Sequence, residues 1–330
     1  MNLKDKTLLY IGPDSGNSYS RYLALQSYFK KTELASYRHL YKNLKGRVLH
    51  KFAKPLFYKQ CTAFARQRFD AVKPDIVWVE MGRELNAELI EHISSLGIPL
   101  INTYSDSFTD TTSKKVSKEY NQSIPYYDAI FTPRQSDFEL YKQHGAKEVF
   151  KFWKGYDSTS ISNHKEDLNL DFVFAGHLEE YRGNLLKNVI NKNDFNYKIY
   201  GHNWDTMNLE NIHPSTSFEA YATLYKNAKI GVNFFSQWAN DTQNSRLFEI
   251  PGSRTFLFTE YSVDAEACFK EGEEAEFFRS EEEFSDKLKF YLKNEDKIKK
   301  IADAGYKVTS EKYTNSARIE QMISNIKAVL

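Results

Sequence analysis

The second half of the chain carries an arginine at a position suited to binding an anion. Arg182 follows the apolar run 170–175 and a turn at Gly176, at the start of a segment with helical periodicity. An arginine beside the free N–H groups of a helix start can fork onto phosphate oxygens. His177 in the same turn could stabilise charge, although a lone histidine is more often structural. An ordinary turn with a solvated arginine would give the same sequence, so this segment alone leaves both interpretations open.

A second group of charged residues lies further along the chain. Arg246 precedes Glu249 by three residues, so the two side chains share one face of a helix. Asp241 lies before them, separated from Glu249 by seven residues. A structural ion pair explains Arg246 and Glu249 equally well. The functional interpretation therefore rests on the whole ordered set of segments, which ends at Gly252 and Ser253.

Three further turns follow predicted strands. Gly201 ends one strand and would let a ligand or another part of the chain approach closely, or would belong to a plain loop. The turn 12–16 contains Gly12, Asp14 and Ser15 and leads into a helix, with a simple strand-to-helix turn as its alternative. Asp106, two residues after the run 99–104, could act as a general base on a hydroxyl group or hydrogen-bond an acceptor. Asp110 is a weaker candidate.

Several kinds of site are disfavoured. The sequence has no G-x-G-x-x-G, no G-x-x-x-x-G-K-[ST], no D-x-D and no G-x-S-x-G motif, which argues against a standard dinucleotide fold, a P-loop, a D-x-D metal site and a serine hydrolase. Two distant cysteines form neither a disulfide framework nor a zinc site. No run of 18 apolar residues exists, and the first residues do not have the pattern of a secretory signal.

The elements that must position these residues alternate in type. Short apolar runs rich in Val, Ile, Phe and Tyr alternate with helical segments, which is typical of parallel α/β sheets. Ligands bind at the carboxyl ends of the strands in such sheets. Predicted strands cover 7–12, 34–38, 75–80, 99–104, 129–132, 148–154, 170–175, 197–200, 230–235, 255–259 and 275–278. Predicted helices lie near 17–30, 40–72, 84–96 and 135–144, and capping boxes at Thr216/Glu219 and Ser280/Glu283 start two more.

The length of 330 residues suits two domains. The polar segment 156–165 is the predicted linker between two doubly wound α/β domains that face each other. We expect an N-terminal domain over residues 1–158 and a C-terminal domain over residues 165–312, followed by a last helix over 313–330.

The ordered set of segments resembles the CgeB-like glycosyltransferases, a branch of the GT-B superfamily akin to the family-4 type enzymes. The resemblance covers about residues 170–320. Its motifs are F-V-F-A-G followed by Arg182, then Y-G-H-N-W, K-I-G-V-N, R-L-F-E-I-P-G and the acidic segment 271–284. The first half is similar mainly over 73–80 and 104–106.

The resemblance implies a GT-B fold, in which two Rossmann-like domains face each other across a cleft and the last helix crosses back to the first domain. It implies a hexosyltransferase-type enzyme of polysaccharide biosynthesis. Arg182 and Arg246 would hold the donor diphosphate, whose leaving-group charge grows in the transition state. Glu249 would hold the ribose hydroxyl groups. Asp241 falls at the position of the family's first acid, one methylene shorter, and would contact the transferred sugar.

The same resemblance extends to the remaining candidates. Gly176, His177, Gly201, Gly252 and Ser253 would line the donor site, with Arg254 as a third cation. The turn carrying Gly12, Asp14 and Ser15 would form the acceptor wall together with Asp106. No divalent metal and no other cofactor is expected.

The charge is uneven along the chain. Residues 1–155 carry 24 Lys and Arg against 16 Asp and Glu, and residues 30–69 hold eleven basic residues and one acid. Residues 40–57 combine this charge with apolar residues at near-helical spacing, and Pro55 should bend or end the helix. A basic amphipathic helix of this kind suits an anionic membrane surface. Alternatively, the apolar stripe packs on the sheet and the lysines are solvated; nucleic acid is not expected.

The sequence therefore predicts transfer of a sugar from a nucleotide sugar to a hydroxyl acceptor, a glycan or lipid-linked glycan, without a metal. The predicted location is cytoplasmic, peripheral on the inner face of the membrane. A nucleotide-sugar epimerase of the same fold and a non-catalytic nucleotide-sugar or glycan-binding module are the alternatives.

Overall fold

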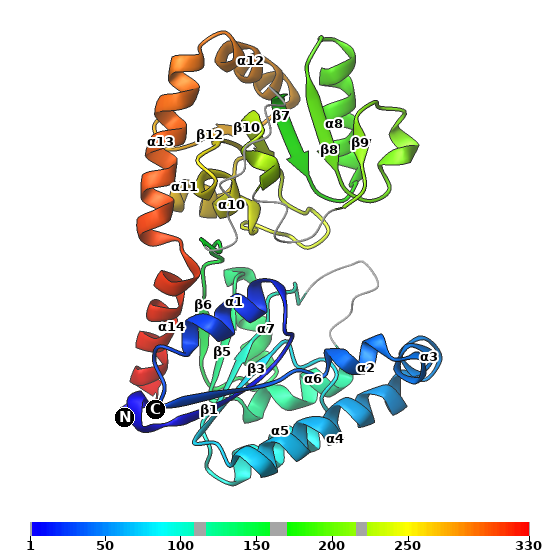
Figure 1. Ribbon diagram of the computed structural model, residues 1–330, viewed down its shortest axis with the longest axis vertical. Coiled ribbons are helices and arrows are strands. Elements are labelled where there is room, and N and C mark those ends of the chain that lie inside the picture. Colours follow the sequence, from blue (N-terminus) through cyan, green and yellow to red (C-terminus); the bar gives the residue numbers. More distant parts are fainter. Residues whose placement is uncertain (1, 109–116, 159–169, 216–222, 330) are drawn as a thin grey trace. The chain divides into compact units, whose positions relative to one another are not determined.

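The computed structural model describes residues 2–108, 117–158, 170–215 and 223–329. The chain forms two compact units. Unit 1 comprises the residues up to Trp153, Trp238–Asn240, and the residues from Asn315 onward; unit 2 comprises Lys154–Gln237 and Asp241–Thr314. Figure 1 shows a parallel sheet with flanking helices in each.

Unit 1 contains a six-stranded parallel sheet in the order β2-β1-β3-β4-β5-β6. Its strands are β1 (Thr7–Ile11), β2 (Lys31–Ala35), β3 (Ile76–Glu80), β4 (Leu100–Thr103), β5 (Ala129–Thr132) and β6 (Val149–Lys151). Its α-helices are α1 (Gly16–Leu25), α2 (Arg38–Lys42), α3 (Leu44–Phe52), α4 (Lys54–Val72), α5 (Ala87–Ser95), α6 (Lys118–Ser123), α7 (Phe138–Gln143) and α14 (Asn315–Val329). Short 3-10 turns cover Leu3–Asp5, Ile124–Tyr126 and Gln135–Asp137.

Both faces of this sheet are buried, because successive residues of a strand point to opposite faces. Leu9 and Ile11 of β1 belong to a core that includes side chains of α4 and α5. Leu8 and Tyr10 belong to the opposite core, which includes side chains of α1 and α14. Figure 1 shows α4 and α5 together along one side of the unit 1 sheet. The near-continuous apolar strands expected of a doubly wound sheet are therefore present.

Unit 2 contains a second six-stranded parallel sheet in the order β12-β11-β10-β7-β8-β9. Its strands are β7 (Leu170–Ala175), β8 (Tyr197–Tyr200), β9 (Ile212–His213), β10 (Ala228–Asn233), β11 (Phe256–Glu260) and β12 (Glu276–Phe278). Its helices are α8 (Glu180–Asn191), the 3-10 helix η4 (Trp204–Met207), α10 (Arg246–Gly252), α11 (Val263–Cys268), α12 (Glu281–Leu292) and α13 (Glu295–Lys312). The core between the strands and α8, α12 and α13 is rich in phenylalanine.

Most strand predictions agree closely with the structure, and β5, β7 and β8 have the predicted bounds. The strand predicted over 34–38 lies three residues too late, since β2 covers Lys31–Ala35. The stretch 40–72 is helical as predicted, but breaks at Asn43 and Ala53 divide it into three helices. The break expected at Pro55 falls two residues earlier, at Ala53, and the break at Asn43 was not predicted. The Asn43 side chain accepts from the Gly46 N–H at 2.6 Å and so starts α3, while Pro55 lies in the first turn of α4, where its missing N–H costs nothing. The two-residue strand β9 was not predicted. Thr216, Glu219 and Asp110 lie outside the described residues, as does most of the predicted linker.

Candidate functional site

The strand order of unit 2 places a topological switch point at the carboxyl edge of its sheet. From β7 the chain proceeds to β8 and β9 on one side, and β10 then pairs with the other side of β7. Loops leaving the carboxyl ends of β7 and β10 therefore diverge, and open α/β sheets bind ligands at such a switch point. The turn at Gly176 and helix α8 follow β7, and the segment leading to α10 follows β10. The predicted Arg182, Asp241 and Arg246 all lie on these connections.

Arg182 lies in the first turn of α8 and is buried. One guanidinium nitrogen pairs with Glu179, and the group lies 5.9 Å from the centre of the Phe174 ring. Its Nε has no hydrogen-bond partner among the described residues. Burial, and then repulsion by Arg246, lower the pKa of Arg182 to about 10, while Glu260 and Asp241 act in the opposite direction. Arg182 thus remains charged at neutral pH in a position that an anion would stabilise.

The same interactions bring four charged groups within electrostatic reach of one another: Arg182, Arg246, Asp241 and Glu260. Glu260 ends β11 and accepts from the Phe235 N–H at 3.0 Å. Burial raises the pKa of Glu260 even though Arg182 lowers it. The site therefore places guanidinium groups, which can donate hydrogen bonds to an anion, beside carboxylate oxygens, which can accept them from hydroxyl groups.

A chain of buried amides fixes α10 at this edge of the sheet. The Asn244 side chain donates to Asn233 Oδ1 and to the Phe234 carbonyl, each at 2.9 Å, and its oxygen caps the helix by accepting from the Leu247 N–H at 3.1 Å. Asn233 in turn donates to Thr259 Oγ1 at 3.0 Å. The ends of β10 and β11 are thereby tied to the first turn of α10, which carries Arg246 and Glu249. Sequence reasoning missed this network, although an Asn at the end of a buried strand was its signal.

Glu249 is buried on the first turn of α10. Burial raises the pKa of its carboxyl group, while the positive charges of Arg246 and Lys154 act against that rise. Lys154 is tied nearby, since its N–H donates to Gln243 Oε1 at 2.9 Å. Arg246 and Glu249 do share one side of a helix turn, as the spacing predicted.

The predicted donor-site glycines are explained by packing. A Cβ on Gly201 would lie 1.9 Å from the Gly176 carbonyl oxygen, and one on Gly252 would lie 2.6 Å from the Tyr156 ring. The Trp204 indole N–H also donates to the Gly176 carbonyl at 2.8 Å. At Gly201 and Gly252 the close approach is therefore by the chain itself.

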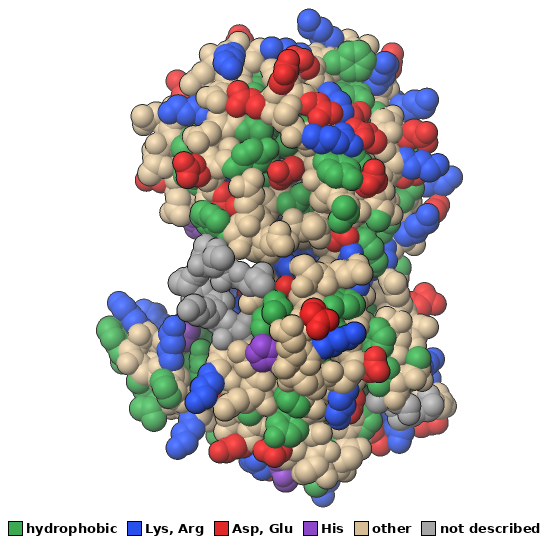
Figure 2. All heavy atoms as spheres, turned by 180° about the vertical axis from the view of Figure 1, so that it is seen from behind, with side chains coloured by type: hydrophobic (Ala, Val, Ile, Leu, Met, Phe, Trp, Pro, Cys, Tyr) green, Lys and Arg blue, Asp and Glu red, His purple; other side chains and the backbone are tan. Residues whose placement is uncertain are grey.

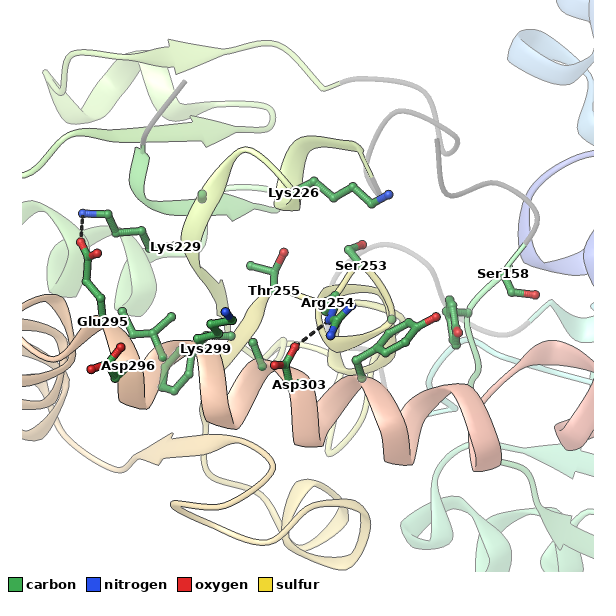
Figure 3. A pocket seen from close by; sticks show the side chains of 17 residues that line it. Ser158, Lys226, Lys229, Ser253, Arg254, Thr255, Glu295, Asp296, Lys299 and Asp303 are labelled. Carbon is green, nitrogen blue, oxygen red and sulfur yellow. Dashed lines mark hydrogen bonds and ion pairs between the residues drawn. The ribbon is translucent and has the colours of Figure 1, made fainter. Parts of the chain in front are cut away.

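Ser253 and Arg254 lie at the other end of α10 from Arg246. Together with Gly252 they line a pocket of about 1040 Å³ that also includes Ala228 and Phe256, the first residues of β10 and β11 (Figure 3). Arg254 pairs there with Asp303 at 2.6 Å. The structure therefore does not bring Gly252, Ser253 and Arg254 to the carboxyl edge of the sheet with Arg182.

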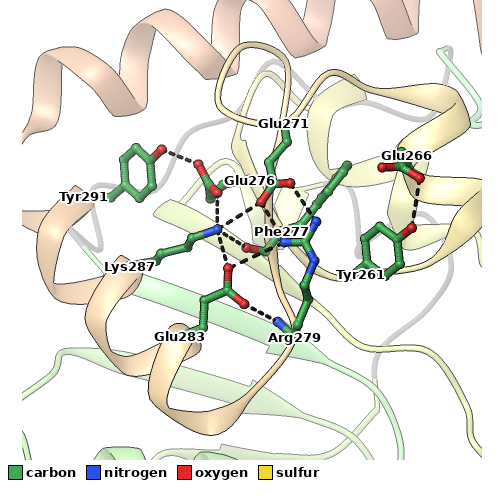
Figure 4. A network of polar contacts seen from close by, with 9 residues as sticks. All are labelled: Tyr261, Glu266, Glu271, Glu276, Phe277, Arg279, Glu283, Lys287 and Tyr291. Carbon is green, nitrogen blue, oxygen red and sulfur yellow. Dashed lines mark hydrogen bonds and ion pairs between the residues drawn. The ribbon is translucent and has the colours of Figure 1, made fainter.

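His177 and the acidic segment of unit 2 make structural contacts. His177 is exposed and stacks on His202, with ring centres 5.2 Å apart. Three carboxylates of the acidic segment, those of Glu271, Glu276 and Glu283, each lie within 3.0 Å of Lys287 Nζ on α12 (Figure 4). This part of the sequence resemblance corresponds to an ion-pair network.

Unit 1 has a corresponding switch point between β1 and β3, because β2 pairs with the other side of β1. A pocket of about 320 Å³ lies there; it is lined by Gly12, Pro13, Tyr37, Arg38, Tyr41, Glu80, Met81, Arg83 and Glu84. The chain turns sharply after β3, with a φ of 63° at Met81 and 84° at Gly82. This turn aims the residues that follow β3 into the pocket.

Two carboxylates of this pocket are held in fixed positions. Glu84 accepts from the Tyr37 hydroxyl at 2.9 Å and from the Tyr41 hydroxyl at 2.8 Å. Glu80 receives two bonds from Arg21, at 3.0 and 3.1 Å, and one from Tyr10 at 2.7 Å. Such pre-oriented carboxylates can accept hydrogen bonds from the hydroxyl groups of a sugar. Sequence reasoning missed Glu80 and Glu84, although an acid that ends a buried apolar run was a usable signal.

The predicted acceptor residues lie around this pocket to different degrees. Gly12 lines it, and a Cβ there would lie 2.7 Å from the Glu80 Cβ, so the glycine has a packing role. Asp14 is exposed and lies 3.5 Å from Arg38. Ser15 occupies the N-cap of α1 without a side-chain cap bond. Asp106 pairs with Arg83, whose Nε donates to the Tyr104 hydroxyl at 2.9 Å.

No group of three or more His, Cys, Asp or Glu side chains suited to a metal ion occurs within the described ranges. None of the helices in those ranges is both long and apolar enough to cross a bilayer.

Comparison with known proteins supports the fold and a broad class. Residues 182–324 match the model of a family described as glycosyl transferase-like. No curated protein sequence matches the chain significantly. The family match and the fold together support a glycosyltransferase, and the CgeB-like subtype stays a prediction.

Solved structures resemble the whole chain. HepE from Anabaena in complex with UDP-glucose aligns over 98% of this chain and 100% of its own, with a TM-score of 0.68 and 10% identity. Sucrose-phosphate synthase from Thermosynechococcus elongatus aligns over 98% and 99%, with a TM-score of 0.66 and 8% identity. A putative UDP-N-acetylglucosamine 2-epimerase from Listeria monocytogenes aligns over 98% and 96%, with a TM-score of 0.61 and 11% identity. At these identities the likeness shows the fold, which is the predicted GT-B fold.

Proposed function

We propose that this protein transfers a sugar from a nucleoside diphosphate sugar to a hydroxyl acceptor. The observation that carries the proposal is the pair of arginines at the switch point of unit 2, where the buried Arg182 carries a charge that Arg246 repels. A diphosphate would relieve that repulsion, and it would fill the hydrogen-bonding capacity of Arg182 Nε.

Each residue of this site has a distinct task in the proposed reaction. As the glycosidic bond breaks, negative charge grows on the leaving diphosphate, and fixed cations lower the barrier by stabilising it. Arg182 and Arg246 supply this charge, so we propose that no divalent metal is needed. Glu249 would accept hydrogen bonds from the ribose hydroxyls, and Asp241 would contact the donor sugar.

The acceptor would bind at the pocket of unit 1. Glu84 and Glu80 present oriented oxygens there, and Asp106 lies beside the pocket through its contact with the pocket residue Arg83. An acceptor hydroxyl must lose its proton during transfer, and a carboxylate within reach can accept it. We propose a glycan or a lipid-linked glycan as the acceptor class.

Calorimetric titration with UDP, GDP, dTDP and CMP, in the presence of EDTA, tests the donor site. UDP is the first choice, because HepE is similar in fold and its structure contains UDP-glucose. Arg246→Met should weaken binding about 10- to 200-fold, since a hydrogen bond to a charged group contributes about 1.5–3 kcal/mol. Arg254→Met is the matched control, because Arg254 lies at the far end of α10. Equal losses in both variants would contradict the assignment.

The fold of the Listeria protein keeps an epimerase as the second candidate. Product analysis of the bound nucleotide sugar separates the candidates. A transferase releases free nucleotide when a hydroxyl acceptor is present, an epimerase returns an isomeric nucleotide sugar, and a binding module leaves the nucleotide sugar unchanged.

A further inference from the structure

Helix α3 presents an apolar face that no other described part of the chain covers. Leu44 and Phe52 are each 75% exposed, and Val48 between them is 48% exposed. Their spacing of four residues places the three side chains on one face of the helix. Leu56, in the first turn of α4, is 55% exposed. Of the ten large hydrophobic residues exposed in the described part of the chain, four therefore lie within residues 44–56, and we call these four side chains the apolar face.

The opposite face of α3 packs against α2 and α4. Gly46 is buried so closely against α2 that a Cβ would lie 1.7 Å from the Leu40 carbonyl oxygen. His50 packs edge-on against Tyr41 and Phe57, with ring centres 5.0 and 5.2 Å apart. Because α3 is anchored through this inner face, its apolar face cannot turn inward. The alternative in which the whole apolar stripe packs on the sheet is thereby wrong for these residues.

Positive charge surrounds the apolar face. Residues 42–59 contain no acid, and their basic side chains are all exposed: Lys42, Lys45, Arg47, Lys51, Lys54 and Lys59. None of the six forms an ion pair within the described ranges, whereas lysines such as Lys6 and Lys147 elsewhere in unit 1 do. Figure 2 shows basic and apolar side chains side by side on the lobe that carries this helix.

We propose that α3 and the first turn of α4 dock unit 1 on an anionic lipid bilayer. Exposed apolar side chains enter the boundary between headgroups and acyl chains, and the flanking cations remain among the phosphates. A second copy of the chain fits less well, because a symmetric contact would bring the two sets of six cations together. Nucleic acid would match the cations but would offer no apolar region for Leu44 and Phe52.

The docking surface is continuous with the proposed acceptor pocket. Helix α2 contributes Arg38 and Tyr41 to the pocket lining and packs on α3 through Leu40 and Gly46. Docking would therefore place the pocket close to the lipid surface, where an acceptor carried on a lipid would be found. This assignment of a lipid-linked acceptor rests on the proposed function, whereas the docking itself does not.

Vesicle sedimentation of the full-length protein tests the docking. Vesicles of phosphatidylcholine with added phosphatidylglycerol should bind the protein, and vesicles of phosphatidylcholine alone should not. Raising the ionic strength from about 0.1 M to about 1 M shortens the Debye length from about 10 Å to about 3 Å and should release it. Equal binding to both vesicle types, or no binding to either, would overturn the proposal.

Two variants locate the contact. Lys45→Gln/Lys51→Gln should lower the partition coefficient about thirtyfold, because each basic residue near an anionic surface contributes about fivefold. Leu44→Ser/Phe52→Ser should lower it about tenfold or more for each side chain. Lys299→Gln/Lys300→Gln and Leu96→Ser are the matched controls, since these residues are also exposed. Losses of equal size in the controls would overturn the assignment to α3.

Further measurements distinguish docking on lipid from binding of another partner, and distinguish a failure of the docking proposal from a failure of the proposed function. Sedimentation velocity without lipid measures the oligomeric state. A wild-type dimer that becomes a monomer in Leu44→Ser/Phe52→Ser would assign the apolar face to a second copy of the chain and would overturn the proposal. A DNA duplex that binds through the same lysines while vesicles do not would overturn it as well.

Nucleotide binding by the α3 variants should equal that of wild type. Vesicle binding without nucleotide binding would support docking and refute the proposed function. Nucleotide binding without vesicle binding would support the proposed function and refute docking.

Discussion

Substitution of Arg182 tests whether this arginine belongs to a ligand-binding site or only forms a structural ion pair with Glu179. Its side chain is 9% exposed, and its pKa is lowered from 12.5 to about 10. That lowering of roughly 2.5 pH units corresponds to about 3 kcal/mol, since one unit is equivalent to about 1.4 kcal/mol. The folded protein holds this proton more weakly than the unfolded chain, so the charge of Arg182 reduces stability at every pH below about 10.

Glu179 partly offsets this cost, so the perturbation must change both residues. The variant Glu179→Gln/Arg182→Met keeps the uncharged contacts of both side chains. In wild type the Gln237 N–H donates to Glu179 at 3.0 Å, and the side-chain oxygen of a glutamine can accept the same hydrogen bond. A methionine at position 182 keeps contact with the Phe174 ring. This variant removes both buried charges together with their desolvation cost; for fully apolar replacements such a change is often neutral or stabilising by about 1–4 kcal/mol. We expect the free variant to be as stable as wild type or more so, by up to about 3 kcal/mol.

Thermal melting with and without UDP measures both consequences. A gain of 1 kcal/mol raises the Tm by roughly 2–4 °C in a domain of this size. Wild type should gain further stability from UDP, because a ligand that binds only the folded state stabilises it by mass action. The variant should melt no lower than wild type without UDP and should show no shift with it. A variant that melts several degrees lower and keeps the UDP shift would refute the reasoning.

Other expectations concern pH, packing and the ion-pair network. Burial raises the pKa of Glu249, so UDP affinity should fall on acidification, and it should do so at a higher pH than for an ordinary glutamic acid. This group causes no loss of stability in acid, because the folded protein binds its proton more tightly than the unfolded chain does. Glu249→Gln should flatten the profile of Kd against pH. Gly201→Ala should destabilise the protein by about 1–3 kcal/mol in denaturant unfolding, because its Cβ would lie 1.9 Å from a backbone oxygen. Lys287→Met should cost about 1–3 kcal/mol by leaving the buried Glu276 without its cation, and the exposed Lys293→Met should cost little in the same unfolding experiment.

The fold could be predicted because its signals are local. Short runs such as 129–132 and 170–175 are apolar at all but one position, which is the pattern of strands buried on both faces of a parallel sheet. The break of the predicted helix over 40–72 was harder to find, because Asn43 starts a new helix through a single side-chain bond to Gly46. Helical periodicity alone does not separate one long helix from three short ones.

The candidate site could be predicted in part for the same reason. Arg182 and Arg246 follow strands that are adjacent in the sheet, so the strand-end rule applied to both. Gly252 and Ser253 were grouped with them because they are near in sequence, but a helix connecting two parallel strands carries its last residues to the opposite edge of the sheet. Glu84 and its tyrosine partners were missed because Tyr37 and Tyr41 are distant in sequence and only the fold brings them together.

Titration of UDP into the protein by calorimetry, in the presence of EDTA, tests most directly whether Arg182 and Arg246 form a diphosphate site. The expected result is binding without metal that Arg246→Met weakens about 10- to 200-fold and Arg254→Met leaves unchanged. If none of the diphosphates UDP, GDP and dTDP binds, or if Arg246→Met binds as wild type does, these arginines do not hold a donor diphosphate.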